Sequence, residues 1–194
     1  MFSALVLSTV VIFVAELGDK SQLMAMTFAT RYRARDVILG ITAATAIVHL
    51  ASVGIGYFIG ASFERYQGPI AIAAGIAFLG FAAWTLRGDE LTDEEAQKAR
   101  KAKGSALLAV GLAFFLAELG DKTMLATITL AVREDWFGTW IGSTVGMVAA
   151  DALAIGVGAL LGRKLPEKVI QYGAAAAFAI FGLVLVAEGA GWLG

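Results

Sequence analysis

The sequence predicts an all-α integral membrane protein, with six transmembrane helices arranged as two inverted three-helix repeats. Three observations support this prediction. The chain of 194 residues is 59% hydrophobic and only 16% charged, which is the composition of a protein embedded in lipid. Its apolar residues gather in stretches long enough to span a bilayer. The second half of the chain also repeats a charged motif of the first half.

Each predicted helix is an apolar stretch bounded by polar residues. A spanning helix needs about 20 mostly apolar residues, and six stretches meet this length: 2–30, 37–61, 68–86, 105–131, 136–162 and 168–193. The first stretch lacks the basic start and the cleavage site of a signal peptide, so we expect it to remain as a helix. The remaining connections are too short for a separate soluble catalytic domain.

The domain organisation follows from the one longer polar segment. Residues 87–104 separate a first three-helix repeat, 1–86, from a second repeat, 105–194. Because this segment carries several basic residues, we expect it to be a cytoplasmic linker.

Basic residues outside the helices are unevenly divided between the two faces of the membrane. One face holds only Arg65 and Arg133. The other face holds eleven, namely Arg31, Arg33, Arg35, Arg87, Lys98, Arg100, Lys101, Lys103, Arg163, Lys164 and Lys168. The positive-inside rule makes the second face cytoplasmic. The sequence therefore predicts a multi-pass protein of the cell inner membrane with both termini outside.

The two halves overlay after a shift of 102 residues. The segment Glu-Leu-Gly-Asp-Lys-Ser at 16–21 then matches Glu-Leu-Gly-Asp-Lys-Thr at 118–123, and the agreement continues through the second helix of each half. The third helices match poorly. Because three spans are an odd number, the second copy enters the membrane in the opposite sense, which is the arrangement of many secondary transporters.

The repeated motifs place acidic residues near the middle of the bilayer, where charge is most costly. We predict a metal site from Glu16, Asp19, Glu118 and Asp121. On a continuous helix, residues spaced by three and four lie on one face, so each motif would direct its acids and its lysine into one cavity. Four carboxylates against two ammonium groups leave two negative charges, which match one divalent cation. Lysine–carboxylate pairs that only lock helices together would leave those two charges without a partner.

Other motif residues are candidates for accessory roles. Gly18 and Gly120 lower helix propensity and favour a local break that frees backbone carbonyls. Hydroxyl oxygens come from Ser21 and Thr123 within the motifs. The remaining candidates are the motif lysines Lys20 and Lys122 and the hydroxyls of Thr27 and Thr129, one or two helical turns further on. An all-oxygen site of this kind suits hard cations such as Mg²⁺, Mn²⁺ and Ca²⁺.

One histidine and one aspartate occupy equivalent points of the second and fifth helices. His49 is the only histidine in the chain, and the repeat pairs it with Asp151. An imidazole in an apolar helix is often only a core residue. Its pairing with a second ionisable group favours a role in proton coupling or as an auxiliary metal ligand.

The doubled motif resembles that of the Golgi and bacterial manganese/calcium exporters, also called the second calcium:proton antiporter family. The resemblance covers essentially the whole chain, and both motifs fit the pattern Glu-x-Gly-Asp-Lys/Arg-Ser/Thr without departure. It implies six transmembrane helices in two inverted halves. It also implies export of Mn²⁺ or Ca²⁺ from the cytoplasm in exchange for protons, with the motif acids as the metal site.

Three other functions remain open at this point. They are a six-helix exporter of a small organic solute such as an amino acid, a passive cation channel and an intramembrane enzyme. Four midplane carboxylates do not suit a zwitterion, and the sequence carries no catalytic motif, so we expect no enzyme. We expect divalent metal ions and protons as transported partners and membrane lipid as the surroundings. We expect no nucleic acid and no resident cofactor. Without cysteine, thiolate and iron–sulfur sites are excluded. The oligomeric state is left undetermined.

Overall fold

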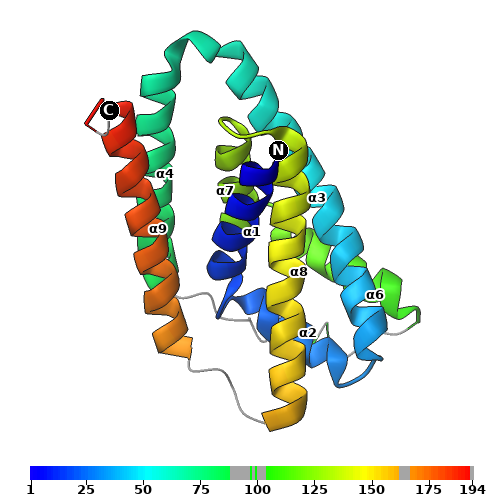
Figure 1. Cartoon of the computed structure of the whole chain (residues 1–194). Helices are drawn as coiled ribbons and strands as arrows, with labels where there is room; N and C mark the ends of the chain where they lie inside the picture. The colour runs from blue at the N-terminus through cyan, green and yellow to red at the C-terminus, as the bar shows by residue number, and fades with distance from the viewer. Residues whose placement is uncertain (88–96, 98, 100–103, 162–166, 193–194) are drawn as a thin grey trace.

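The computed structural model describes residues 1–87, 97, 99, 104–161 and 167–192, and every regular element in these ranges is helical (Figure 1). Most of the predicted linker, 87–104, lies outside the described residues, as do several basic residues of the predicted cytoplasmic face. The elements are α1 (Phe2–Glu16), α2 (Lys20–Ala29), α3 (Ala34–Ser62), the 3₁₀ turn η1 (Glu64–Tyr66), α4 (Gln67–Arg87), α6 (Ala106–Glu118), α7 (Lys122–Ala131), α8 (Trp136–Leu161) and α9 (Glu167–Gly189).

Four helices contain an uninterrupted stretch that is long and apolar enough to cross a membrane. Within the described residues these stretches are Ala34–Ser62, Gln67–Arg87, Trp136–Ala159 and Gln171–Gly189. The pair α1 and α2 makes a fifth candidate span if it is counted as one bent segment, whereas α6 is a shorter apolar helix. The protein is therefore an all-α membrane protein with four or five candidate spans, and the predicted count of six stays a prediction.

The first and fourth predicted helices are broken at the motif. The expected stretch 2–30 ends as a helix at Glu16 and begins again at Lys20, with a bend of 78° between the two axes. The expected stretch 105–131 is interrupted between Glu118 and Lys122. The prediction that each motif lies on one continuous helical face was wrong.

Glycine conformation explains both breaks. Gly18 and Gly120 have φ values of +77° and +80°, in the left-handed region that side-chain-bearing residues rarely adopt. A helix cannot continue through such a residue. The alternative prediction, that these two glycines permit a local break, is confirmed.

The helix boundaries repeat with the same offset as the sequence. Helix α2, Lys20–Ala29, corresponds to α7, Lys122–Ala131, and the ends of α1 and α6 at Glu16 and Glu118 are likewise 102 residues apart. The duplication is therefore present in local structure as well as in sequence. Figure 1 shows both chain termini toward the same end of the bundle.

Glycines bring α1 and α8 close together. A Cβ atom added at Gly142 of α8 would lie 2.3 Å from the carbonyl oxygen of Leu5, and one added at Gly146 would lie 2.6 Å from that of Thr9. Backbone contact at this distance excludes any side chain at these positions. Small residues allow such close approach of helices in lipid, where apolar side chains gain nothing by leaving the hydrocarbon.

The third helices of the two halves, α4 and α9, pack against each other and stand beside the rest of the bundle (Figure 1). Gly75 and Gly182 are in reciprocal contact, because a Cβ at either one would fall within 2.8 Å of the other's carbonyl oxygen. An aromatic cluster that includes Phe78, Phe178 and Phe181 also joins the two helices. The two helices therefore form one unit despite their poor sequence match.

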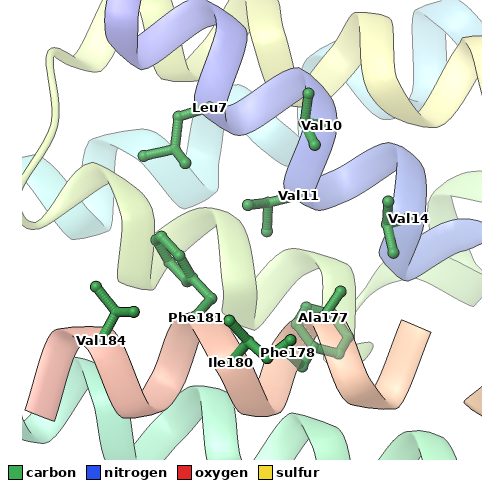
Figure 2. Close-up of a pocket in the computed structure, with 9 residues that line it drawn as sticks. All are labelled: Leu7, Val10, Val11, Val14, Ala177, Phe178, Ile180, Phe181 and Val184. Atoms are coloured by element: carbon green, nitrogen blue, oxygen red, sulfur yellow. The ribbon is translucent and has the colours of Figure 1, made fainter. Parts of the chain in front are cut away.

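An apolar groove of about 370 Å³ separates this unit from α1. Figure 2 shows the lining side chains of α1 and α9 facing each other across it: Leu7, Val10, Val11, Val14, Ala177, Phe178, Ile180, Phe181 and Val184. None of these residues is polar. The contact between the α4–α9 unit and α1 is consequently looser than the glycine-mediated contact between α1 and α8.

The close packing of α1 on α8 can be tested by adding a methyl group. We expect Gly142→Ala to lower the free energy of unfolding by about 1–3 kcal/mol, since the helices must separate to admit the Cβ. Gly156→Ala, in the same helix but with no atom within 4 Å of the added Cβ, is the matched control. Thermal unfolding in detergent micelles measures both, and equal midpoints would contradict this packing.

Candidate metal and proton site

Both motifs lie at the helix breaks, so their acidic side chains come from the ends of helices. Glu16 is the last residue of α1 and Asp19 is the N-cap of α2, where its carboxylate accepts a hydrogen bond from the Ser21 amide at 3.3 Å. Glu118 and Asp121 hold the same places around the second break. All four acids are buried.

The aspartates and lysines of the two motifs pair crosswise. Lys122 of the second motif donates to Asp19 of the first, and both side chains are almost completely buried. Lys20 of the first motif lies 3.8 Å from Asp121 of the second. The structure therefore joins the two halves through these pairs.

Among the residues that the structure describes, neither glutamate forms a salt bridge with a lysine. Glu16 accepts a hydrogen bond from the Ser21 hydroxyl, and Glu118 accepts one from the Thr123 hydroxyl at 2.9 Å. In each glutamate the second carboxylate oxygen is buried and has no hydrogen-bond partner among the described residues. An unsatisfied charged oxygen in a medium without water is expensive, so these two oxygens mark where a cation or a proton is needed.

The acids are near enough to influence one another. Glu16 lies within electrostatic range of Asp19, Glu118 and Asp151, and also of Lys122. Glu118 in turn feels Asp121, Asp19 and Asp151. The two motifs therefore contribute to one charged region between the halves.

The equivalent residues His49 and Asp151 differ in their surroundings. Asp151 is fully buried in α8 and interacts electrostatically with Asp19. His49 is fully buried in α3, and within the part of the chain that the structure describes no charged group acts on it and neither ring nitrogen has a hydrogen-bond partner. Asp151 thus belongs to the acidic region, whereas no hydrogen bond within the described residues links His49 to a motif residue.

The predicted hydroxyl ligands Thr27 and Thr129 bond elsewhere. Each donates to the carbonyl four residues earlier in its own helix, at 2.8 Å. Neither bond involves a motif residue. Metal binding by Thr27 and Thr129 therefore stays a prediction.

Gln22 is a site residue that the sequence did not single out. Its side chain is buried, accepts a hydrogen bond from the Gly18 amide at 2.8 Å, and donates one to the Ala150 carbonyl of α8, also at 2.8 Å. The available signal was that the repeat places Met124 at the equivalent point, which is a chemical difference beside two otherwise matching motifs.

Among the residues that the structure describes, no three Asp, Glu or His side chains come close enough together to hold one metal ion. Asp19 and Asp121 contact lysines, whereas Glu16, Glu118 and Asp151 each have a buried carboxylate oxygen without a hydrogen-bond partner among the described residues. Coordination by all four motif acids remains a prediction.

Comparison with known proteins identifies the family. Residues 4–93 and 106–192 match the model of the family described as the divalent cation/proton antiporter GDT1. The chain is 32% identical over 187 residues to a Vibrio cholerae protein named "Putative manganese exporter", a match that covers 94% of this chain and 90% of that protein. It is also 28% identical over 199 residues to a GDT1-like protein of Synechocystis, covering 95% and 97% of the two chains.

A plant relative is longer than this chain. A GDT1-like chloroplast protein of Oryza sativa subsp. japonica is 34% identical over 186 residues, which cover 82% of this chain and 54% of the relative. This chain therefore spans about half of that protein. No solved structure matches the chain.

These matches cover both halves of the molecule, including both motifs and both helix breaks. The chain belongs to the GDT1 family of divalent cation/proton antiporters, and it is a transporter rather than an enzyme.

The crosswise pairing generates a stability prediction. Lys122→Met removes the ammonium group and leaves Asp19 buried with its charge, so we expect a loss of about 3–5 kcal/mol in the free energy of unfolding. The double variant Asp19→Asn/Lys122→Met should recover part of that loss, because no unpaired charge remains. Arg133→Met breaks the exposed pair with Glu188 and is the control, with an expected effect within about 1 kcal/mol. Thermal unfolding measures all three, and equal effects of the two single variants would contradict the buried pair.

Proposed function

We propose that this antiporter exports Mn²⁺ from the cytoplasm in exchange for protons, with Glu16 and Glu118 as the groups that alternate between metal and protons. The proposal is supported chiefly by the two buried glutamate oxygens that lack a hydrogen-bond partner among the described residues, one in each motif. Asp19 and Asp121 complete the proposed metal site. Lys20 and Lys122 balance the charge of the aspartates across the repeat.

The exchange follows from charge balance in a medium of low dielectric constant. The lysines offset Asp19 and Asp121, so the two glutamates carry the remaining negative charge of the motifs. An ionised carboxylate cannot stay buried and unpaired without a cost of several kcal/mol. One divalent cation, or one proton on each glutamate, removes that cost. Metal and protons therefore compete for the same groups, which couples their movements in opposite directions.

Mn²⁺ is the proposed ion and Ca²⁺ is the second candidate. Carboxylate and hydroxyl oxygens bind both, so the site chemistry alone accommodates either ion. The Vibrio cholerae relative, whose name refers to manganese, supports Mn²⁺. Asp151, beside Asp19, is the proposed route for protons between site and solvent. His49, buried at the equivalent point of α3, is proposed to assist.

The proposed membrane arrangement has six crossings in two inverted repeats, 1–86 and 105–194, joined by a cytoplasmic linker over 87–104. It counts α1 with α2, and α6 with α7, as two broken spans. Helix α1 is about 22 Å long at 1.5 Å per residue, which is shorter than the hydrocarbon core, so a helix that starts at one interface would end inside the bilayer. The cell inner membrane, with both termini outside, is the proposed location.

The glutamates provide the direct test of function. In proteoliposomes with an imposed pH gradient, we expect Glu16→Gln and Glu118→Gln to reduce Mn²⁺ flux to the leak of empty liposomes, because each removes both a ligand and a proton acceptor. Glu188→Gln, at an exposed glutamate outside the motifs, should stay within about twofold of the unsubstituted protein. Proton-coupled Mn²⁺ flux at the normal rate in Glu16→Gln would disprove the exchange mechanism.

The topology has its own test. The chain contains no cysteine, so Ser3→Cys and Gly104→Cys each introduce a unique thiol without background. We expect a membrane-impermeant maleimide to label position 3 from outside intact spheroplasts and position 104 only in inverted vesicles. Labelling of both positions from the same side would require a different number of spans.

A further inference from the structure

The first helix break is braced against α8 by one side chain. The amide oxygen of Gln22 accepts the Gly18 N–H, and the amide nitrogen donates to the Ala150 carbonyl, each at 2.8 Å. Gly18 is the left-handed residue that creates the break, and Ala150 directly precedes Asp151. Gln22 thus connects the two backbone segments that carry Asp19 and Asp151.

The second repeat treats the same positions differently. Its equivalent of Gln22 is Met124, whose sulfur accepts the Gly120 N–H at 3.2 Å. A thioether has no proton to donate, so Met124 cannot donate a hydrogen bond to the Val48 carbonyl, which is the equivalent of the Ala150 carbonyl. The Val48 carbonyl instead accepts a bond from the Ser52 hydroxyl of its own helix, at 2.7 Å.

The two repeats differ in whether the side-chain hydrogen bond to this carbonyl lies within one helix or joins two helices. In both repeats the carbonyl on the long helix has an additional side-chain donor. Only in the first repeat does that donor come from another helix, 128 positions away in sequence. The residue equivalent to Ser52 is Ala154, which lies on α8 four residues after Ala150. Alanine has no hydroxyl, so no local side chain competes with Gln22 for the Ala150 carbonyl. The Ala150 carbonyl is therefore bonded from another helix by Gln22, whereas the equivalent Val48 carbonyl is bonded from its own helix by Ser52.

We propose that Gln22 is a positioning residue of the cation site, which fixes the broken helix of the first repeat against α8 and so holds Asp19 beside Asp151. The inference rests on the proposed function of the motif acids and deepens it. It makes the halves unequal: the first break is hydrogen-bonded to α8 of the opposite repeat through Gln22, whereas Met124 at the second break contacts the Gly120 amide of its own repeat.

The test separates two effects of losing Gln22: loss of the bond between helices, and loss of a donor to the Ala150 carbonyl. Gln22→Met copies the second repeat, keeps a weak acceptor for Gly18 and removes the donor to Ala150. Gln22→Met/Ala154→Ser also supplies the local hydroxyl, so the Ala150 carbonyl is satisfied as Val48 is. Met124→Leu is the matched control at the equivalent break, where only the weak sulfur contact is lost. Mn²⁺ flux in proteoliposomes and thermal unfolding in micelles are measured for each.

We expect Gln22→Met to raise the half-saturating Mn²⁺ concentration about tenfold, the equivalent of one lost buried hydrogen bond, with maximal flux changed by less than about twofold. The double variant should recover the unfolding temperature while its half-saturating concentration stays raised. Met124→Leu should change neither. Recovery of normal half-saturation in the double variant, or no change in Gln22→Met, would overturn the proposal, because the bond would then serve stability alone.

A second readout does not depend on transport. Hydrogen exchange of the Gly18 amide should become about tenfold faster in the double variant, since the helix break is no longer tied to α8, while the Gly120 amide keeps its rate. Unchanged exchange at Gly18 would overturn the brace. Absence of Mn²⁺ flux in the unsubstituted protein would instead overturn the proposed function, and the exchange result would still decide the role of Gln22.

Discussion

The burial of five of the six charged motif side chains, with Lys20 partly exposed, is the constraint on which the rest of this structure depends. The contact between Lys122 and Asp19 is the clearest response to it, because both groups are nearly fully buried and come from different repeats. Each aspartate is balanced by a lysine of the other half, so the site requires both halves to be assembled.

The helix breaks make that pairing possible. On two continuous helices the motif side chains would extend sideways from the helix surfaces. The left-handed glycines end α1 and α6 at the glutamates and begin α2 and α7 at the aspartates, so that acids and lysines meet at the ends of half-helices. Non-helical backbone at membrane depth is tolerated only where protein surrounds it. The close glycine contacts of α1 with α8, and of α3 with α7, provide this cover.

Around this charged centre the packing is uneven. The helices that bear or cover the motifs are joined through glycines, whereas the α4–α9 unit is separated from α1 by a groove with purely apolar walls. Nothing polar fixes that boundary along the groove. The firm contacts lie where the position of charged groups must be defined, and the loose contact lies where only hydrocarbon surfaces meet. The same unevenness appears within the site, since Asp151 belongs to the acidic region and His49 does not.

The sequence by itself determined the membrane class, the duplication and the chemical character of the site. Those features depend on local composition: apolar stretches, a motif repeated after 102 residues, and acids in positions where lipid makes charge costly. The family followed from the same residues, and the comparison with known proteins confirmed it. The permissive role of Gly18 and Gly120 was also readable, because only glycine adopts the left-handed conformation without strain.

Only the tertiary structure decided how these groups meet. Periodicity favoured a continuous helix through each motif, since the penalty for glycine is small compared with the preference of an apolar stretch for helix. That prediction failed because Gly18 and Gly120 adopt the left-handed conformation, through which a helix cannot continue. The crosswise partners of Asp19 and Asp121 and the contact of Gln22 with Ala150 all join residues about 100 or more positions apart. Such contacts depend on how α2, α7 and α8 pack in three dimensions, and sequence spacing carries no information about that distance.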